Sequence, residues 1–270
     1  MIRLDQIQSF FPPQVRDNPA HQKHILKEYI QLMILDYLSS TSYARKIVFI
    51  GGTNLRLIKG IDRFSEDLDF DCKSFTEDEF NEMTDSVLLY LERQGLRLET
   101  KENINKSLQA FRKNIFFPEL LFELGLSGHR EERFLIKIEC QDQEVPYATQ
   151  KVNIKGCGFY FPFPVPSDGV LTAMKLSALI SRQKGRDFYD AMFLLGQSGP
   201  DWAFLTARWG IGDAASLHKA LHDLLQKIDL DHKARDFDHL VFEKRHSTRI
   251  LMFKEFIDTL PLFSSLNGEL

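Results

Sequence analysis

The sequence predicts an α+β fold, in which a mixed sheet with flanking helices is followed by a helical region. Short runs of β-branched and aromatic residues alternate with amphipathic helical segments up to about residue 160. The proline-rich stretch 161–166 follows, and the pattern after it is helical. Because proline cannot donate a hydrogen bond inside a sheet, this stretch is the expected connector. We therefore expect an α/β domain at residues 1–164 and a helical domain at residues 165–270.

The composition is that of an ordinary globular chain, with 270 residues, 43% hydrophobic and 27% charged. A net charge of −4 argues against broad coating of nucleic acid, although a local basic groove remains compatible with it. The first residues lack the apolar core of a signal peptide, and no stretch approaches the roughly 20 apolar residues of a membrane span. Cys72, Cys140 and Cys157 have no C-x-x-C spacing. We expect a reducing, cytoplasmic location.

A helix at residues 18–39 is expected to precede a short buried strand at 46–50, which runs into two glycines. Good helix formers follow at 53–59, so the Gly51-Gly52-Thr53 turn is expected to open a short helix with Thr53 near its N-cap. Orphan N–H groups and the positive end of the helix dipole make such a turn an anion site. The Thr53 hydroxyl would add a donor, and the turn can cradle a phosphate.

Residues 67–71 alternate acidic and apolar side chains, which is typical of a half-buried strand. Side chains two apart share a face, so Asp67, Asp69 and Asp71 project together. Carboxylates gathered in this way repel one another unless a cation lies between them, and Mg²⁺ suits such a site because it takes few protein carboxylates. A solvated face of an amphipathic strand is the alternative. The Gly-Gly-Thr turn just before it favours the metal.

A helix is expected at 75–94. Four further strand candidates follow it, at 96–102, 107–117, 133–141 and 151–160. In the third of these the alternation places Leu135, Lys137 and Glu139 on one face. Glu139 is thus an acid at the end of an otherwise apolar strand. It is either a further metal ligand or a solvated strand end.

After the proline-rich stretch, a helix is expected from about residue 168 to Gln183, with Gly185 kinking or ending it before a segment at 186–195. Residues seven apart on one helix share a face, and so do residues three apart. The result is a basic stripe that ends in acids: Lys175, Arg182, Lys184, Arg186, Asp187 and Asp190. A solvated, salt-bridged helix face is the alternative interpretation.

Beyond residue 199 the sequence carries less information. Residues 214–228 and 247–260 have the spacing of amphipathic helices whose apolar residues face a core. His218, His222, His232 and His239 fit no metal motif that the sequence alone defines. We expect them to be ordinary surface or core histidines.

Two blocks of the sequence resemble the AbiEii/AbiGii toxin family of nucleotidyltransferases. The first comprises Gly51-Gly52-Thr53-x-Leu55-Arg56 and Arg63-Phe64-Ser65-Glu66-Asp67-Leu68-Asp69-Phe70. The second is Lys175-Leu176-x-Ala178-Leu179-x-x-Arg182-x-Lys184-x-Arg186-Asp187-x-x-Asp190. That family belongs to the DNA polymerase β-like superfamily, which shares a strand, a Gly-Gly/Ser turn and a D-x-D strand. The resemblance implies a polymerase β-like mixed sheet in the first domain and a helical domain that packs against it and completes the active-site cleft.

The resemblance also implies roles for individual residues. Asp67, Asp69 and Glu139 would hold Mg²⁺, or alternatively Mn²⁺, while Lys175 would contact the triphosphate of an NTP. Asp187 or Asp190 would order the basic residues or the nucleotide, and the sequence does not decide between them. The residues expected to bind the NTP are therefore Gly51, Gly52, Thr53, Arg56, Lys175, Arg182, Arg186, Asp187 and Asp190.

The activity that follows is Mg²⁺-dependent transfer of NMP from an NTP to an acceptor hydroxyl. Family members act as toxins of toxin–antitoxin or abortive-infection systems, and some modify tRNA 3′ ends. RNA is therefore the expected acceptor and a separately encoded antitoxin the expected partner, although a protein hydroxyl or a small molecule fits the residues equally well. Two alternatives remain, a metal-dependent nuclease and a catalytically silent NTP-binding regulator.

Overall fold

The computed structural model describes residues 2–101 and 110–262, and the chain divides into two compact units. Unit 1 comprises Met1–Gly60, Phe64–Glu144 and Thr149–Val165. Unit 2 comprises Ile61–Arg63, Val145–Ala148 and Pro166–Leu270. The two short segments that unit 2 takes from the first part of the chain have no boundary signal in the sequence. One of them, Ile61–Arg63, ends four residues before Asp67.

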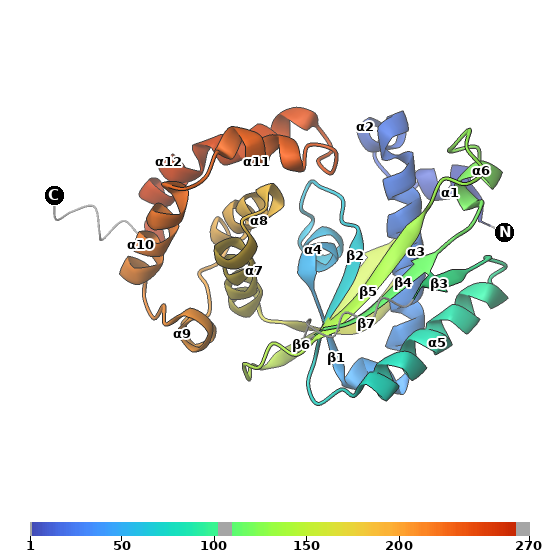
Figure 1. Ribbon diagram of the computed structural model, residues 1–270, viewed down its shortest axis with the longest axis horizontal. Coiled ribbons are helices and arrows are strands. Elements are labelled where there is room, and N and C mark those ends of the chain that lie inside the picture. The colour runs from blue at the N-terminus through green and yellow to red at the C-terminus, as the bar shows by residue number, and fades with distance from the viewer. Residues whose placement is uncertain (1, 102–109, 263–270) are drawn as a thin grey trace. The chain divides into compact units, whose positions relative to one another are not determined.

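Unit 1 is built on a five-stranded mixed sheet (Figure 1). Its strands are, in spatial order, β1 (Ile47–Ile50), β2 (Asp67–Cys72), β5 (Leu135–Gln141), β4 (Phe111–Phe116) and β3 (Glu99–Lys101). β2 and β5 are parallel, and the other neighbouring pairs are antiparallel. The α+β prediction is confirmed. Part of the strand expected at 107–117 lies outside the described residues.

Two helices of unit 1, α3 (Gln22–Ser39) and α5 (Glu77–Arg93), lie side by side, with the rings of Tyr37 and Tyr90 stacked at 4.5 Å. α5 reaches the sheet through Phe80, whose ring lies 5.6 Å from that of Phe111 in β4. The shorter helical segments of the unit complete it: α1 (Leu4–Gln8), α2 (Pro13–Arg16), η1 (Pro19–His21), η2 (Ser42–Arg45), α4 (Gly51–Asn54), η3 (Leu55–Lys59) and α6 (Leu120–Glu123).

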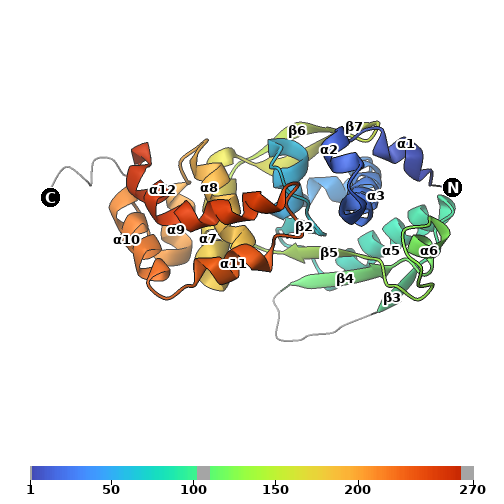
Figure 2. The same ribbon diagram turned by 90° about the horizontal axis from the view of Figure 1, so that it is seen from above.

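A separate hairpin of β6 (Thr149–Gly156) and β7 (Phe159–Pro166) packs on α3 through the rings of Tyr29 and Phe159. In Figure 2 this hairpin and the strands β4 and β5 lie on either side of α3. The stretch 161–166, which was expected to be a connector, is instead part of strand β7, in a sheet that has no central strand. Its three prolines are two residues apart, so the positions that lack N–H groups all fall on one edge of β7, and β6 pairs with the other edge.

The strand alternation sorts the sheet into an apolar and a polar face. Leu68 and Phe70 of β2 are buried, as are Ile136, Ile138 and Cys140 of β5. These side chains share the face on which Phe111 of β4 meets α5, because Phe111 pairs with Cys140. The acids of β2 and β5 project from the opposite face. The sheet thus holds its carboxylates away from the helices that cover its core side.

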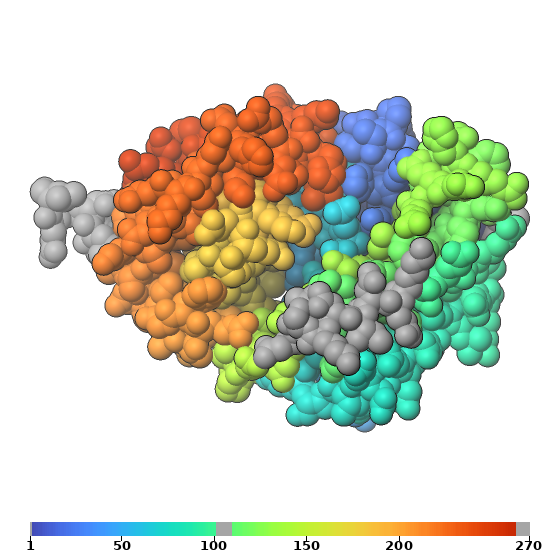
Figure 3. Space-filling model, viewed as in Figure 1, coloured from blue at the N-terminus to red at the C-terminus, as the bar shows by residue number. Residues whose placement is uncertain are grey.

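Unit 2 is helical, as the pattern after residue 166 predicts. Its helices are α7 (Asp168–Arg182), α8 (Gly185–Leu195), α9 (Trp202–Trp209), α10 (Ala214–Leu225), α11 (Leu230–Asp236), η4 (Lys244–Met252) and α12 (Phe253–Thr259). Figure 3 shows the side chains of α9 to α11, in orange, around those of α7 and α8, in yellow. Among the described helices of the chain, none has the length and apolar content that a membrane crossing requires.

The helix ends before a second segment, as expected, but Gly185 is the first residue of α8 rather than the end of α7. Gln183, at φ 54°, ends α7 in the left-handed region, and Gly185 opens α8. A Cβ on Gly185 would lie 1.9 Å from the backbone oxygen of Lys233 in α11. Glycine is therefore required here by the close approach of another helix rather than by a turn.

Candidate active site

The polar face of the sheet gathers charged side chains from three adjacent strands. In the parallel pairing of β2 and β5, Asp67 lies opposite Lys137 and Asp69 lies opposite Glu139. In the antiparallel pairing of β4 and β5, Arg112 lies opposite Glu139. The register therefore brings together Asp67, Asp69 and Glu139, the three carboxylates that the sequence analysis assigned to the site. It also places two cations beside them, Lys137 and Arg112, which the sequence analysis did not assign to the site.

These cations bind the carboxylates directly. The Lys137 Nζ lies 2.9 Å from Asp67 Oδ2 and 3.7 Å from Glu139 Oε2. The Arg112 guanidinium contacts Glu139 Oε2 through Nη2 at 2.7 Å and through Nε at 2.8 Å. All four side chains are only partly exposed, so their charges are screened less than those of a surface pair. Glu139 is thus drawn toward Arg112 and Lys137.

Asp69 lies against the backbone of the glycine turn. Gly51 has φ 82°, and a Cβ there would lie 2.2 Å from Asp69 Oδ2. Both the backbone conformation and the close approach demand glycine. The turn and the carboxylate therefore form one structural feature, in which strand β1 ends opposite Asp69 and the helix starts beside its oxygen atoms.

Thr53 and Arg56 make contacts within the protein that the sequence did not predict. The helix begins at Gly51 with Ile50 as its N-cap, so Thr53 is not near the cap. Thr53 is fully buried, and its hydroxyl donates to the backbone oxygen of Asp67. The Arg56 guanidinium is held by Glu28 of α3, with Nε 2.8 Å from Oε2 and Nη2 3.2 Å from Oε1. In this structure both side chains therefore fix the chain around the turn.

Unit 2 contains a fully buried charge network centred on Asp190 in α8. Arg63 donates to both carboxylate oxygens through Nε and Nη2, each at 2.7 Å, and Lys175 Nζ of α7 lies 2.9 Å from Oδ2. Burial alone would raise the pKa of Asp190, but the two cations lower it to about 2. Burial lowers the pKa of Lys175, and Asp190 partly offsets that change. Asp190 therefore orders Lys175.

Asp187 serves a different cation. It accepts hydrogen bonds from the Arg182 guanidinium, at 2.7 Å from Nη2, and from the backbone N–H of Lys184 at 3.1 Å, which caps α8. The two acids thus contact different basic residues, Asp187 the exposed Arg182 and Asp190 the buried Arg63 and Lys175. The basic residues of α7 and α8 do not form a single stripe. Lys175 is buried, whereas Arg182 is 44% exposed.

Asp62, next to Arg63, contacts two other elements of unit 2, α8 and η4. Its carboxylate accepts a hydrogen bond of 2.6 Å from Tyr189 and pairs with Arg249 at 3.0 Å and His246 at 2.8 Å. Burial, followed by the hydrogen bond to Asp62, raises the pKa of Tyr189 well above its ordinary value. Sequence reasoning missed both Asp62 and the role of Arg63. The available signal was an arginine four residues before the Asp-x-Asp pair.

Asp67 and Asp69 fit the requirements of a Mg²⁺ ion, since both are short carboxylates on one strand face, and Asp69 lies beside the glycine turn. Glu139 fits less directly, because Arg112 and Lys137 already engage its carboxylate. Within the described ranges, one group of three or more His, Cys, Asp or Glu side chains converges closely enough for a metal ion. It lies in unit 2 and consists of His218, His222 and Asp258. We therefore regard Asp67 and Asp69 as the core of any Mg²⁺ site.

A mixed sheet with paired aspartates beside a glycine turn, accompanied by a helical unit with a buried lysine, is the arrangement that the resemblance to nucleotidyltransferases implies. The family described as "Nucleotidyl transferase AbiEii toxin, Type IV TA system" matches residues 34–261. The chain belongs to this AbiEii family of toxin nucleotidyltransferases, and the resemblance noted in the sequence is confirmed.

Solved structures share the fold. JHP933 from Helicobacter pylori is 20% identical, with 91% of this chain and 97% of that chain covered and a TM-score of 0.52. MenT4, a nucleotidyltransferase toxin from Mycobacterium tuberculosis, is 17% identical, with 98% and 93% covered and a TM-score of 0.58. No curated protein sequence matches the chain.

Proposed function

We propose that this toxin transfers NMP from an NTP to a hydroxyl of RNA, with the 3′ end of tRNA as the first candidate acceptor. The reaction would depend on Mg²⁺, and a separately encoded antitoxin would restrain it in the cytoplasm. Membership of a toxin nucleotidyltransferase family supports the NTP and the antitoxin. The observation that supports the Mg²⁺ dependence is the placement of Asp67 and Asp69 on one strand face, with Asp69 against the glycine turn, whereas the choice of RNA as acceptor follows from the family resemblance.

Asp67 and Asp69 would hold the metal, which supplies positive charge to the triphosphate during transfer. The Gly51-Gly52 backbone would approach the β- and γ-phosphates, because no side chain stands between this turn and Asp69. Glu139 would polarise the hydroxyl of the acceptor. Arg112 and Lys137 would balance the negative charge of its carboxylate. No nucleophilic side chain is needed, since transfer of this kind depends on positioning and electrostatics.

Lys175 remains our candidate for contact with the triphosphate. Its ammonium is held by Asp190 at 2.9 Å, so its position is fixed before any ligand arrives. Asp190 would act through Lys175 and Arg63, because its carboxylate accepts the hydrogen bonds of Arg63 and forms an ion pair with Lys175. Arg182 and Arg186 of the same region remain proposed nucleotide contacts. Arg182 is ordered by Asp187.

The test is RNA labelling by purified protein with each NTP in turn, radiolabelled at the α-phosphate, in the presence of Mg²⁺ and total RNA. Asp69→Asn removes one proposed metal ligand, and Asp85→Asn is its matched control, because Asp85 is 65% exposed on α5. We expect a labelled RNA band with wild type and with Asp85→Asn. Loss of a metal ligand should slow labelling by about a thousandfold or more.

Other outcomes identify the alternatives. RNA cleavage in the absence of NTP would indicate a metal-dependent nuclease. NTP that binds and is recovered unchanged, with no label in RNA, would indicate another acceptor or a silent regulator. Near-normal labelling by Asp69→Asn would remove the assigned site. Inducible expression that leaves growth unaffected while soluble protein accumulates would contradict the toxic role of this chain.

A further inference from the structure

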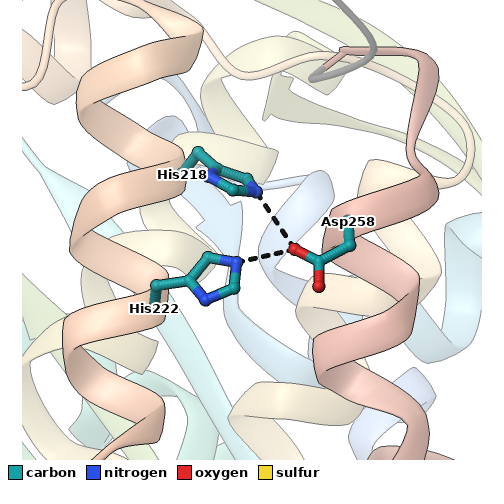
Figure 4. Close-up of side chains that lie close together, drawn as sticks. All are labelled: His218, His222 and Asp258. Atoms are coloured by element: carbon teal, nitrogen blue, oxygen red, sulfur yellow. Dashed lines mark hydrogen bonds and ion pairs between the residues drawn. The ribbon is translucent and has the colours of Figure 1, made fainter. Parts of the chain in front are cut away.

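Three side chains of unit 2 that the proposed function does not use converge between two helices (Figure 4). His218 and His222 project from α10, and Asp258 projects from α12. The Nε2 atoms of the two histidines lie 3.2 Å and 2.7 Å from the same carboxylate oxygen, Asp258 Oδ1. The expectation that these are ordinary histidines took no account of Asp258, which lies 36 residues beyond His222.

The local structure explains the convergence. His218 and His222 are four residues apart on one helix, so they share a face, and their ring centroids are 4.4 Å apart. Asp213 begins that helix with a capping box, which fixes where its turns start. On α12 the neighbouring turn is anchored by Ile257, which is fully buried. Both helices are therefore held in place by contacts that do not involve the three polar side chains.

The donor set is that of a transition-metal site. Two imidazole nitrogens and one carboxylate oxygen are ligands that Zn²⁺ accepts, whereas Mg²⁺ prefers oxygen alone. The three donor atoms lie within 4.8 Å of one another. Tetrahedral ligands at about 2.0 Å from zinc are roughly 3.3 Å apart, so small side-chain rotations suffice to complete the site. The side chains are 20%, 28% and 37% exposed, which leaves a path for the ion from solvent.

The charges favour a cation at this position. Two imidazoles share a single carboxylate oxygen, and each can donate to it only when its Nε2 carries the proton. A metal ion can replace both protons and use the same three atoms.

We propose that His218, His222 and Asp258 bind one Zn²⁺ or a similar divalent transition-metal ion, with water at the fourth position. The ion fastens α12 to α10 and stabilises this end of unit 2. This inference stands apart from the nucleotidyltransferase site, because it uses nitrogen donors and none of the residues assigned to that site.

The test is a calorimetric titration of untagged, EDTA-treated protein with Zn²⁺. The metal content of the protein is measured after dialysis. Asp69→Asn serves as the background, so that ion binding at the catalytic carboxylates does not contribute. We expect one Zn²⁺ per chain, and affinity reduced about 100-fold or more by His222→Asn and by Asp258→Asn. His239→Asn is the matched control, since His239 is exposed and lies outside the cluster.

Two further readouts separate a metal site from a simple hydrogen-bonded cluster. Co²⁺ bound in place of Zn²⁺ should give the visible absorption of a tetrahedral site, and this absorption should be absent in His222→Asn. Saturating Zn²⁺ should raise Tm by about 5 °C in the background protein and in His239→Asn. Far-UV circular dichroism establishes that each variant is folded. Absence of stoichiometric binding, or equal binding by His222→Asn, Asp258→Asn and the control, would overturn the proposal.

Discussion

Replacing Asp190 with asparagine tests the buried charge network of unit 2. The substitution keeps the volume of the side chain but removes the carboxylate that contacts both Arg63 and Lys175. Both cations are almost completely buried, at 1% and 7% side-chain exposure, so neither can recover its hydration without local unfolding. Asp190→Asn therefore removes the negative charge that both cations share in a low-dielectric environment.

The expected cost is large relative to the stability of a domain. Removing one partner of a buried ion pair costs about 3–5 kcal/mol, and a whole domain is stable by about 5–15 kcal/mol. Asp187→Asn is the matched control three residues earlier on α8. Its partner Arg182 is 44% exposed and can return to water, so the ion pair contributes about 0–1 kcal/mol and the helix cap about 1 kcal/mol.

Urea unfolding of the full chain, followed by circular dichroism, measures both costs. We expect Asp190→Asn to lower the free energy of unfolding by at least about 2 kcal/mol more than Asp187→Asn does. Combining Asp190→Asn with Arg63→Met should recover part of the loss, because one buried charge is then removed. Equal destabilisation by Asp190→Asn and Asp187→Asn, or a further loss in the double variant, would refute the reasoning.

The same network predicts a dependence on acid. The pKa of Asp190 is about 2 in the folded state, below the ordinary value of 3.8. A group with a lowered pKa stabilises the fold above its unfolded pKa, and this contribution is lost as the pH falls through the folded value. Between pH 5 and pH 2 the wild type should therefore lose about 2 kcal/mol more stability than Asp190→Asn. Parallel losses in the two proteins would contradict the assigned pKa.

Two further predictions concern the sheet face of unit 1. Gly51→Ala should abolish transfer, because its Cβ would lie 2.2 Å from Asp69 Oδ2. Gly60 also has a positive φ, but no atom lies within 4 Å of its Cβ, so Gly60→Ala should cost only about 1–2 kcal/mol of stability and retain activity. Equal activity of the two variants in the labelling assay would refute the role of the close contact. Lys137→Met should tighten Mn²⁺ binding about tenfold, because the Lys137 ammonium lies 2.9 Å from Asp67 Oδ2 and competes with the ion. A paramagnetic-resonance titration measures this affinity. Unchanged or weaker binding would argue against a metal at this carboxylate.

Strand faces could be predicted from the sequence, whereas strand pairing could not. Alternation in 67–71 and 134–140 correctly separated Asp67 and Asp69 from Leu68, and Lys137 and Glu139 from their apolar neighbours. Only the parallel register of β2 and β5 shows that Lys137 lies opposite Asp67 and forms an ion pair with it. Periodicity describes one strand at a time, and register depends on how two distant strands meet.

Interactions between distant segments account for most of what the sequence did not predict. Arg63 and Asp190 are separated by 127 residues, and an arginine preceding an acidic strand looks like a solvated residue until its burial is known. The pair His218 and His222 is visible as a helical spacing, but its third partner lies on another helix. The residue types in these clusters are evident from the sequence, and their grouping requires the tertiary fold.

The most direct test of the central claim follows two labels in parallel. Purified protein, RNA and Mg²⁺ are incubated with an NTP radiolabelled either at the α-phosphate or at the γ-phosphate, with Asp69→Asn alongside. Transfer of NMP predicts that the α label enters RNA, that the γ label leaves with pyrophosphate, and that Asp69→Asn loses the RNA signal. Entry of the γ label into RNA, or full α labelling by Asp69→Asn, would contradict nucleotidyl transfer to RNA at this sheet face.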